Sequence, residues 1–353
     1  MSSAIGSLSV EAARLRDRLE VLTRQAASGQ RAEALGDLAP EAPRAIALRA
    51  DLARREIYGR SMDQALARTS LTQTALGRMT DIAREFRTSA GMRANSADPG
   101  SLVTLQARAR AALTEVAHLL NSRHAGEYVF GGSDIGRPPI PDPTGLAGGQ
   151  MAQDIAAAMD TLGGGNAASV AAQTLAIAGS TAAGTSPFSA FLDDPAGGGA
   201  EARRATPSGD GEVIGYGIAA NRNASAASTG VSTGGWARDL LRNLMSVAAL
   251  TPAQMAAPED FDAMVSSIRQ GFESAERTLG EEAGALGAVE SRIESAQRRH
   301  SLVSDVLARQ LGDIQEVDLA ETLTRLQATR IALEASYRAL GSISQLTLAQ
   351  FLR

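Results

Sequence analysis

The feature that most constrains this chain is a long run of apolar residues spaced alternately by three and four positions between residues 261 and 307. This spacing places side chains on one stripe of a helix, and a stripe sustained over several heptads needs a partner helix along its length. The run consists of Phe261, Met264, Ile268, Phe272, Ala275, Leu279, Glu282, Leu286, Val289, Ile293, Ala296, His300, Val303 and Leu307. Only Glu282 and His300 interrupt its apolar character, and we interpret both as structural positions that set the register or pack against the partner.

Three further helical patterns occupy the two ends of the chain. The first seam is Ile5, Leu8, Ala12, Leu15, Leu19, Leu22 and Ala26, and the last is Leu319, Leu323, Leu326, Arg330, Leu333, Tyr337 and Leu340. A long helix over 44–95 carries Tyr58, Met62, Leu66, Leu76, Met79, Ala83 and Phe86 on one face. Because the arms match in length, we expect the short seams to pair with each other and the long helices likewise. The breaks at 29–43 and 311–318 then lie side by side.

The helical spacing of apolar residues ends after a helix that begins at Asp98–Pro99 and runs to about residue 125. Gly126 is suited to end that helix, "EYVF" has strand character, and Gly131–Gly132 is a candidate hairpin turn. From about 140 to 235 the chain is rich in Gly, Ala, Ser and Thr. We predict strands at 211–218 and, more weakly, at 187–192, with loose or disordered chain around 163–185.

The predicted fold is mainly α, with long antiparallel helical rods, a terminal coiled coil and a small β-rich or loop-rich insert. A length of 353 residues favours two or three domains. The predicted division is a terminal coiled-coil domain of 1–30 and 316–353, a helical rod of 31–135 and 236–315 with a β-hairpin near 127–135, and an inserted outer domain of 136–235. We expect the insert to be β-rich or partly disordered.

The composition excludes several classes of chemistry. The chain has no cysteine and no lysine, which removes thiolate metal sites, disulfides, cysteine nucleophiles and lysine-based catalysis. The net charge of −5 argues against a nucleic-acid binder, and no apolar run reaches the length of a membrane span. His118 and His124 stand six apart, outside metal-ligand spacing, and no G-x-S-x-G pattern occurs. We therefore expect no catalytic residue, metal or cofactor, and no Sec-type signal peptide is visible.

Four segments resemble the hook-associated protein 3 family, the hook–filament junction branch of the flagellin-like axial proteins. They are 24–52, 119–140, 213–224 and 318–352. The second, "LLNSRHAGEYVFGG" followed by "RPPI", is similar to the family's helix end, Gly-x-Tyr-x-Phe-x-Gly strand and Pro-Pro pair. Its matching residues are Gly126, Tyr128, Phe130, Gly132, Pro138 and Pro139. The stretch "EALGDLAPEAP" departs from the family because it lacks the paired aspartates often found before the proline.

The resemblance implies an extracellular structural subunit of the bacterial flagellum, exported by the flagellar type III apparatus without a cleaved signal peptide. Its implied partners are further copies of itself in a ring, hook-associated protein 1, flagellin, and an export chaperone or the export apparatus, with no nucleic acid or membrane. The predicted assembly interface is Ile5, Leu8, Leu15, Leu19, Leu22, Leu319, Leu323, Leu326, Leu333, Tyr337 and Leu340. The alternatives are flagellin itself and, more remotely, an enzyme in the 141–235 insert, although that segment contains no histidine.

Overall fold

The computed structural model describes residues 2–32, 34–93, 99–195, 198, 202–228 and 230–351. The chain is mainly helical, as predicted, and divides into two compact units, one of residues 1–57 with 299–353 and one of residues 58–298. Two helices, α2 (Ala42–Arg93) and α8 (Pro258–Gln315), each contribute residues to both units.

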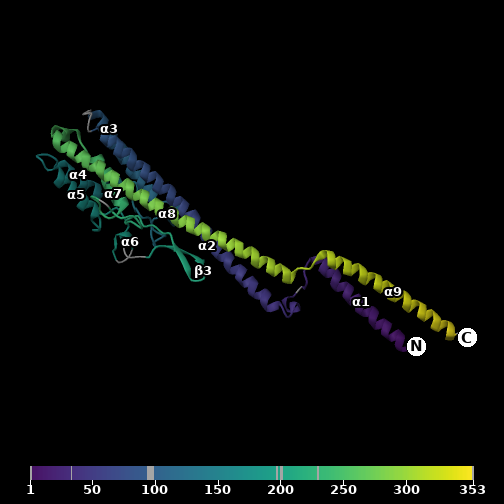
Figure 1. Cartoon of the computed structure of the whole chain (residues 1–353). Coiled ribbons are helices and arrows are strands. Elements are labelled where there is room, and N and C mark those ends of the chain that lie inside the picture. Colours follow the sequence, from purple (N-terminus) through teal and green to yellow (C-terminus); the bar gives the residue numbers. More distant parts are fainter. Residues whose placement is uncertain are drawn as a thin grey trace. The chain divides into compact units, whose positions relative to one another are not determined.

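The first unit contains the two ends of the chain. Helices α1 (Ser2–Ser28) and α9 (Leu319–Phe351) pack together, and the N- and C-termini lie at the same end of this pair (Figure 1). Where the two helices meet the rest of the unit, the Arg31 N–H donates to the Gln315 carbonyl at 2.7 Å and the Val317 N–H donates to the Gly29 carbonyl at 3.0 Å. The predicted pairing of the terminal helices and the adjacency of the two breaks are therefore confirmed.

A small apolar core stabilises the part of the first unit outside the α1–α9 pair. The 3₁₀ turn η1 (Leu35–Leu38) follows α1, and Leu38 packs with Ala45 and Leu48 of α2 and Ile314 of α8. The first unit thus consists of one helix pair, α1 with α9, and a stem in which the beginning of α2 packs on the end of α8.

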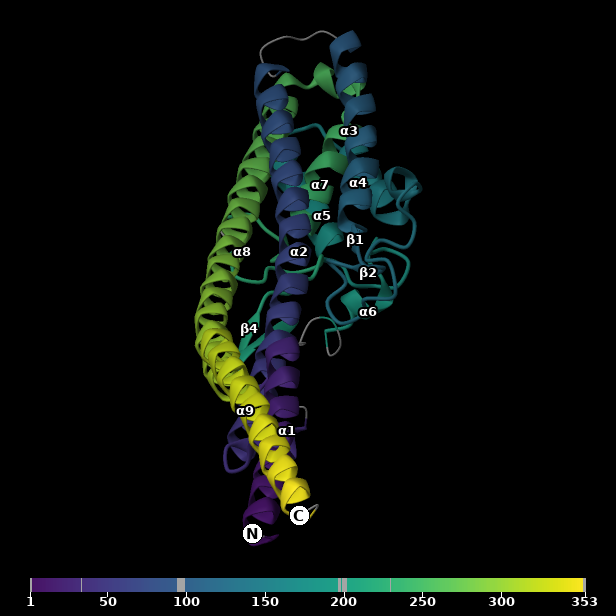
Figure 2. The same ribbon diagram turned by 90° about the vertical axis from the view of Figure 1, so that its right-hand side faces the viewer.

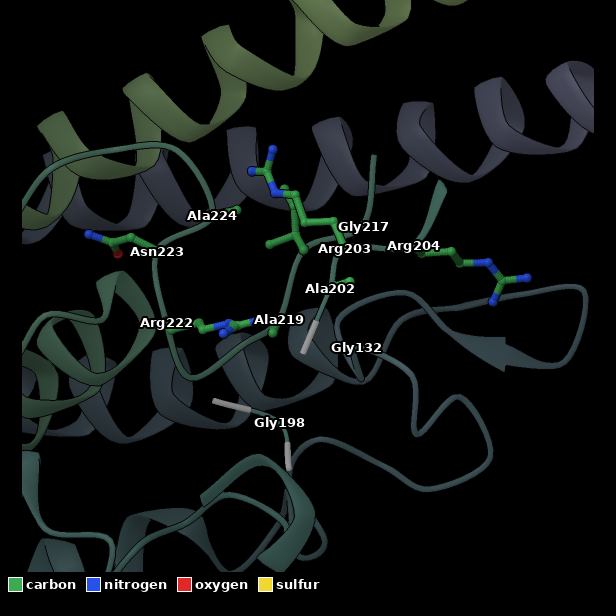
Figure 3. Close-up of a pocket in the computed structure, with 11 residues that line it drawn as sticks. Gly132, Gly198, Ala202, Arg203, Arg204, Gly217, Ala219, Arg222, Asn223 and Ala224 are labelled. Carbon is green, nitrogen blue, oxygen red and sulfur yellow. The ribbon is translucent and has the colours of Figure 1, made fainter. Parts of the chain in front are cut away.

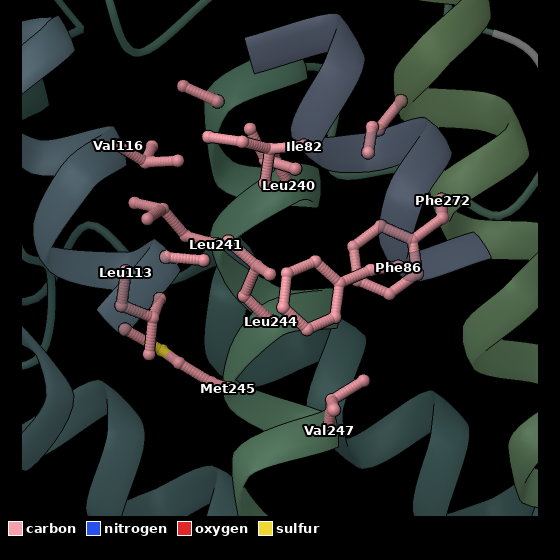
Figure 4. Packing of buried hydrophobic residues seen from close by; sticks show 14 of the residues in the cluster. Ile82, Phe86, Leu113, Val116, Leu240, Leu241, Leu244, Met245, Val247 and Phe272 are labelled. Carbon is pink, nitrogen blue, oxygen red and sulfur yellow. The ribbon is translucent and has the colours of Figure 1, made fainter. Parts of the chain in front are cut away.

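The core of the second unit lies between α2, α3 (Pro99–Leu120), α7 (Trp236–Ala249) and α8. Figure 2 shows α2 between α8 and α3. The rings of Phe86 and Phe272 stack at 5.9 Å between centroids, among the apolar side chains in Figure 4. The Gln73 amide donates to the Ala283 carbonyl at 2.8 Å. Because Phe86 lies after Gln73 on α2 whereas its partner Phe272 lies before Ala283 on α8, the two helices run antiparallel.

The long apolar stripe of α8 is buried or half-buried along nearly its whole length, which confirms the heptad prediction. The exception is Val303, which is 38% exposed. Helix α7, whose apolar and polar faces are both buried, fills the space between α3 and α8. It ends before η3 (Pro252–Ala256), where the Gln254 side chain accepts from the Thr251 N–H at 2.9 Å as one half of a capping box.

The segment 136–235 differs from the prediction in its first half. It contains η2 (Leu146–Gly148), α4 (Gln150–Asp160), α5 (Ala167–Gly179), the short α6 (Ala190–Asp193), β3 (Ala205–Gly209) and β4 (Glu212–Gly215). The strand expected at 211–218 is confirmed as β4. The strand expected at 187–192 is wrong because α6 lies there, and the loose chain expected at 163–185 includes α5.

Small side chains explain why α5 was missed. Its buried stripe is Ala167, Val170, Thr174 and Ala178, which resembles low-complexity sequence although its spacing is helical. Of these residues, Ala167, Val170 and Ala178, with Met151, Ile155 and Met159 of α4, join the same apolar cluster as α3 and α7. The β3–β4 hairpin packs elsewhere, with Ile214 and Tyr216 against Met62 and Ile293.

Candidate assembly site

The predicted interface residues on α1 face its partner helix. Leu22 is 7% exposed, and Leu8, Leu15 and Leu19 are half-buried, whereas most other described side chains of α1 are exposed. The side chain of Ile5 lies outside the described residues. The step of three and four along α1 was therefore sufficient to identify the face that packs on α9.

On α9 only half of the predicted interface residues are covered within the chain. Leu326, Leu333 and Leu340 are buried or half-buried as expected, but Leu319 is 49% exposed and Tyr337 is 51% exposed. Leu323 and Arg330 are exposed as well. The other positions on the covered face are Thr322 and Thr329, which are buried, and Ser336, which is half-buried.

The correction has a physical reason. In a two-helix pair the contact is narrow, and the small Thr and Ser side chains let the two backbones approach, while the larger residues one position later fall on the flank. Helix α9 therefore carries two adjacent stripes, and Leu326, Leu333 and Leu340 belong to the covered one. One stripe is covered by α1, and the other, with Leu319, Leu323 and Tyr337, faces solvent. The role of both stripes in assembly remains a prediction.

The motif residues near position 126 form a tight hairpin that was expected a few residues later. Strands β1 (Arg123–His124) and β2 (Glu127–Tyr128) pair across the two-residue turn Ala125–Gly126, whose φ angles are +50° and +86°. Positive φ at both central residues defines a type I′ turn. Gly126 is thus a turn residue and not the end of α3. The hairpin spans 123–128, so placing it near 127–135 with a turn at Gly131–Gly132 was wrong.

After the hairpin, the motif joins the two ends of the insert. Phe130 is fully buried and packs edge to face on Trp236, the first residue of α7, at 5.9 Å between centroids. The Phe130 carbonyl accepts from the Ala220 N–H at 2.9 Å. The chain leaving α3 and the chain returning to α7 are therefore fastened together at this point.

A buried arginine of α2 binds the β1–β2 hairpin. Arg68 is 4% exposed and donates to Glu127 at 3.0 Å and to the Tyr128 carbonyl. Arg204 pairs with the same carboxylate at 2.7 Å. Burial, followed by the nearby Arg204 charge, lowers the pKa of Arg68. The two guanidiniums on one carboxylate form a charged cluster that fixes β2 on the bundle.

The proline pair begins the insert and is anchored on both sides. Asn121, just after α3, donates to the Ile140 carbonyl at 2.7 Å and accepts from the Ile140 N–H at 2.9 Å. The carbonyl of the buried Pro139 accepts from the Ser189 N–H at 2.9 Å. Pro138 is half-buried beside it. These contacts set the direction in which the insert leaves the bundle.

Glu282, which interrupts the apolar stripe of α8, fixes the return of the chain. One of its carboxylate oxygens accepts three backbone N–H groups, from Ala224, Ser225 and Ala226, each at 2.8 Å. The residue is 1% exposed. Such charge-assisted bonds to consecutive N–H groups explain why a carboxylate occupies a core position, and they support the structural role predicted for it.

Arg238 of α7 binds several segments in the middle of the insert. Its guanidinium donates to the carbonyls of Ala178 at 2.9 Å and Ser180 at 3.0 Å, pairs with Asp193, and lies 5.0 Å from the centre of the Phe188 ring. Burial lowers the pKa of Arg238 and raises the pKa of Asp193, and each charge offsets part of the shift on its partner. No sequence pattern singles out this residue, because its partners lie 45 to 60 positions away.

Beside the junction lies a cavity of about 260 Å³, shown in Figure 3. Its wall includes Gly132, Gly217 and the three arginines Arg203, Arg204 and Arg222. Arg203 donates to Ser225 at 2.8 Å, and Arg204 donates to Tyr216 at 3.0 Å besides pairing with Glu127. Arg203 and Arg204 therefore stabilise the segments that line the cavity.

Within the described ranges no group of three or more His, Asp or Glu side chains is arranged to hold a metal ion. His300 lies 3.1 Å from the Arg55 guanidinium through its Nδ1, so it packs against α2 within the first unit, as expected. A search of the described helices finds none that combines the length and apolar character of a membrane span.

Comparison with known proteins identifies one part of the chain. Residues 270–352 match the bacterial flagellin C-terminal helical region. The match covers about four-fifths of α8 and all of α9, and it supports a flagellin-like structural subunit of the bacterial flagellum. A search of curated proteins finds no significant match.

Proposed function

We propose that this chain forms the junction between hook-associated protein 1 and the flagellin filament. In this role a ring of subunits contacts the hook side on one face and flagellin on the other. The proposal is structural and assigns the chain no catalytic step, cofactor or metal.

The observation that carries the proposal is the built junction of residues 121–140. The residues that resemble the hook-associated protein 3 family are the ones that fasten the insert: Gly126 turns the hairpin, Phe130 packs on Trp236, and Pro139 accepts from Ser189. The residues that resemble the family's motif are therefore also the residues that hold the insert in place. The terminal helix pair supports assembly, because α9 retains an uncovered apolar stripe.

Flagellin is the second candidate, and the match of residues 270–352 fits it as well as it fits a junction subunit. An enzyme in the insert is a remote third candidate, since cavity-lining side chains such as Arg203 and Arg204 are held by structural partners. Under either flagellar reading, we propose export through the flagellar type III apparatus, with an export chaperone as a further partner.

The deciding experiment is deletion of the gene in its host, with hooks imaged by electron microscopy and flagellin measured in the culture medium. A junction subunit predicts intact hooks, no filaments, and flagellin released as monomer. Bare hooks without filament protein in the medium identify the chain as flagellin instead. Filaments of normal length refute both assignments, and re-expression of the chain controls for polar effects of the deletion.

A further inference from the structure

The uncovered stripe of α9 has a definite pattern. Leu319, Leu323 and Arg330 are spaced by four and then seven residues, and at 100° per residue they fall within an arc of about 40°. Leu319 and Leu323 are 49% and 50% exposed. Arg330 lies at the solvent surface with Glu334 as its ion-pair partner, at 3.4 Å. This surface, the α9 stripe, is flanked by the side of the helix that α1 covers.

A matching pattern lies on the stem of the same unit. On α8, Leu302, Val306 and Asp313 have the same spacing of four and seven and also fall within an arc of about 40°. Leu302 is 67% exposed, Val306 is 43% exposed and Asp313 is exposed. We call this surface the α8 stripe.

The two stripes are complementary when the helices lie parallel. Leu319 then meets Leu302, Leu323 meets Val306, and the positive Arg330 meets the negative Asp313 in the same register. The offset is seventeen residues, or roughly 25 Å along the helix axis. Two apolar layers followed by a pair of opposite charges specify one register and one direction, because a shifted or reversed alignment leaves the charges unmatched.

A single chain cannot make this contact. Residues 316–318 join the end of α8 directly to the beginning of α9, so Leu319 and Leu302 are held apart by more than three turns of helix. In addition, α9 is already paired with α1 within its own chain. The occupant of the α9 stripe must therefore come from another molecule, and the same chain carries the complementary surface.

We propose that the α9 stripe of one subunit packs in parallel on the α8 stripe of a second copy. The contact is heterologous, since each subunit uses a different surface toward each neighbour, so every added copy leaves one free stripe of each kind. Repetition of such a contact produces a ring or a helical array and not a closed dimer. The inference rests on the proposed function as an assembling subunit, which it deepens by naming the surfaces that meet.

Cross-linking tests the contact, because the chain has no cysteine of its own. The full-length variant carrying Val306→Cys and Leu323→Cys is expected to form a ladder of oligomers on oxidation, both in flagella sheared from cells and in the purified chain at high concentration. The matched control carries Val306→Cys and Ile331→Cys, because Ile331 is 68% exposed and lies about 100° around α9 from the centre of the stripe. A ladder of equal yield from the control overturns the proposal.

A charge exchange tests the register. Arg330→Glu and Asp313→Arg are each expected to lower the ladder yield about tenfold, and the double variant to restore it. Arg325→Glu, on the other flank of α9, leaves the yield nearly unchanged. Absence of the chain from flagella refutes the proposed function, whereas a chain present in flagella or in purified oligomers without a 306–323 ladder refutes this interface alone.

Discussion

Replacing Gly271 by alanine should destabilise the second unit although it adds a better helix former. Gly271 lies within α8, and a Cβ atom there falls 2.2 Å from the Oδ1 atom of Asn243 and 2.7 Å from its Cγ. Real contacts of this kind are never so short, so Asn243 or the helix must move. Asn243 is 1% exposed in α7, where its side chain has no open space to enter.

The size of the effect follows from what Asn243 must give up. Its amide donates to the Asp239 carbonyl at 2.8 Å, and its oxygen accepts from Arg242 at 3.2 Å. Overpacking costs about 1–3 kcal/mol, and a buried polar group left without its partner costs about as much. Alanine returns about 1 kcal/mol through helix propensity. The net expectation is a loss of about 3 kcal/mol, equivalent to a fall in melting temperature of roughly 6–12 °C.

The matched control is Gly280→Ala in the same helix. No atom lies within 4 Å of a Cβ built at Gly280, and the position is exposed, so this variant should gain about 0.5–1 kcal/mol. Thermal and urea unfolding of the two variants followed by circular dichroism measure the difference. If Gly271→Ala unfolds at or above the temperature of Gly280→Ala, the close approach of α7 and α8 at Asn243 is wrong.

Three further changes test other parts of the structure. Leu326→Asp places a charge in the α1–α9 seam, so assembly observed by electron microscopy should fail while the second unit melts as before; normal assembly contradicts the pairing. Glu282→Gln keeps an acceptor but removes the charge that binds the N–H groups of 224–226, and urea unfolding should show a loss of about 1–2 kcal/mol, with faster hydrogen exchange in that loop. Ala125→Gly relieves a positive φ of +50° in the hairpin turn and should raise the unfolding free energy by about 0.5–1 kcal/mol, whereas a decrease contradicts the type I′ geometry.

The helical arms could be predicted from the sequence because their buried stripes use large apolar residues at regular spacing. Phe272 and Leu279 in α8, and Met79 and Phe86 in α2, are buried where the periodicity places them. The helices of the insert could not be predicted in the same way. In α5 the buried stripe is built from alanine, valine and threonine, and such residues indicate a helix only when the surface they pack against is known.

The α9 seam illustrates a second limit. A heptad pattern identifies apolar positions but does not say how many helices share them, so Leu323 and Tyr337 were assigned to the same contact as Leu326 and Leu333. In a pair of helices only one side of that wide stripe is covered. The residues misplaced by the prediction are therefore the ones that remain available to another molecule.

The anchors of the insert mark a third limit, because they are single polar residues whose partners are remote in sequence. Glu282 binds a loop more than fifty residues earlier, and Asp260 of α8 accepts from the Gly165 N–H at 2.8 Å. Each carboxylate is buried on α8 and satisfies backbone N–H groups of the insert. The apolar side chains of α4 and α5 pack in the cluster shared with α3 and α7, and polar anchors from the helices fix loops of the insert on the bundle. An insert held in this way can change its exposed residues freely, provided that the few segments touching Glu282, Asp260 and Arg238 keep their backbone paths.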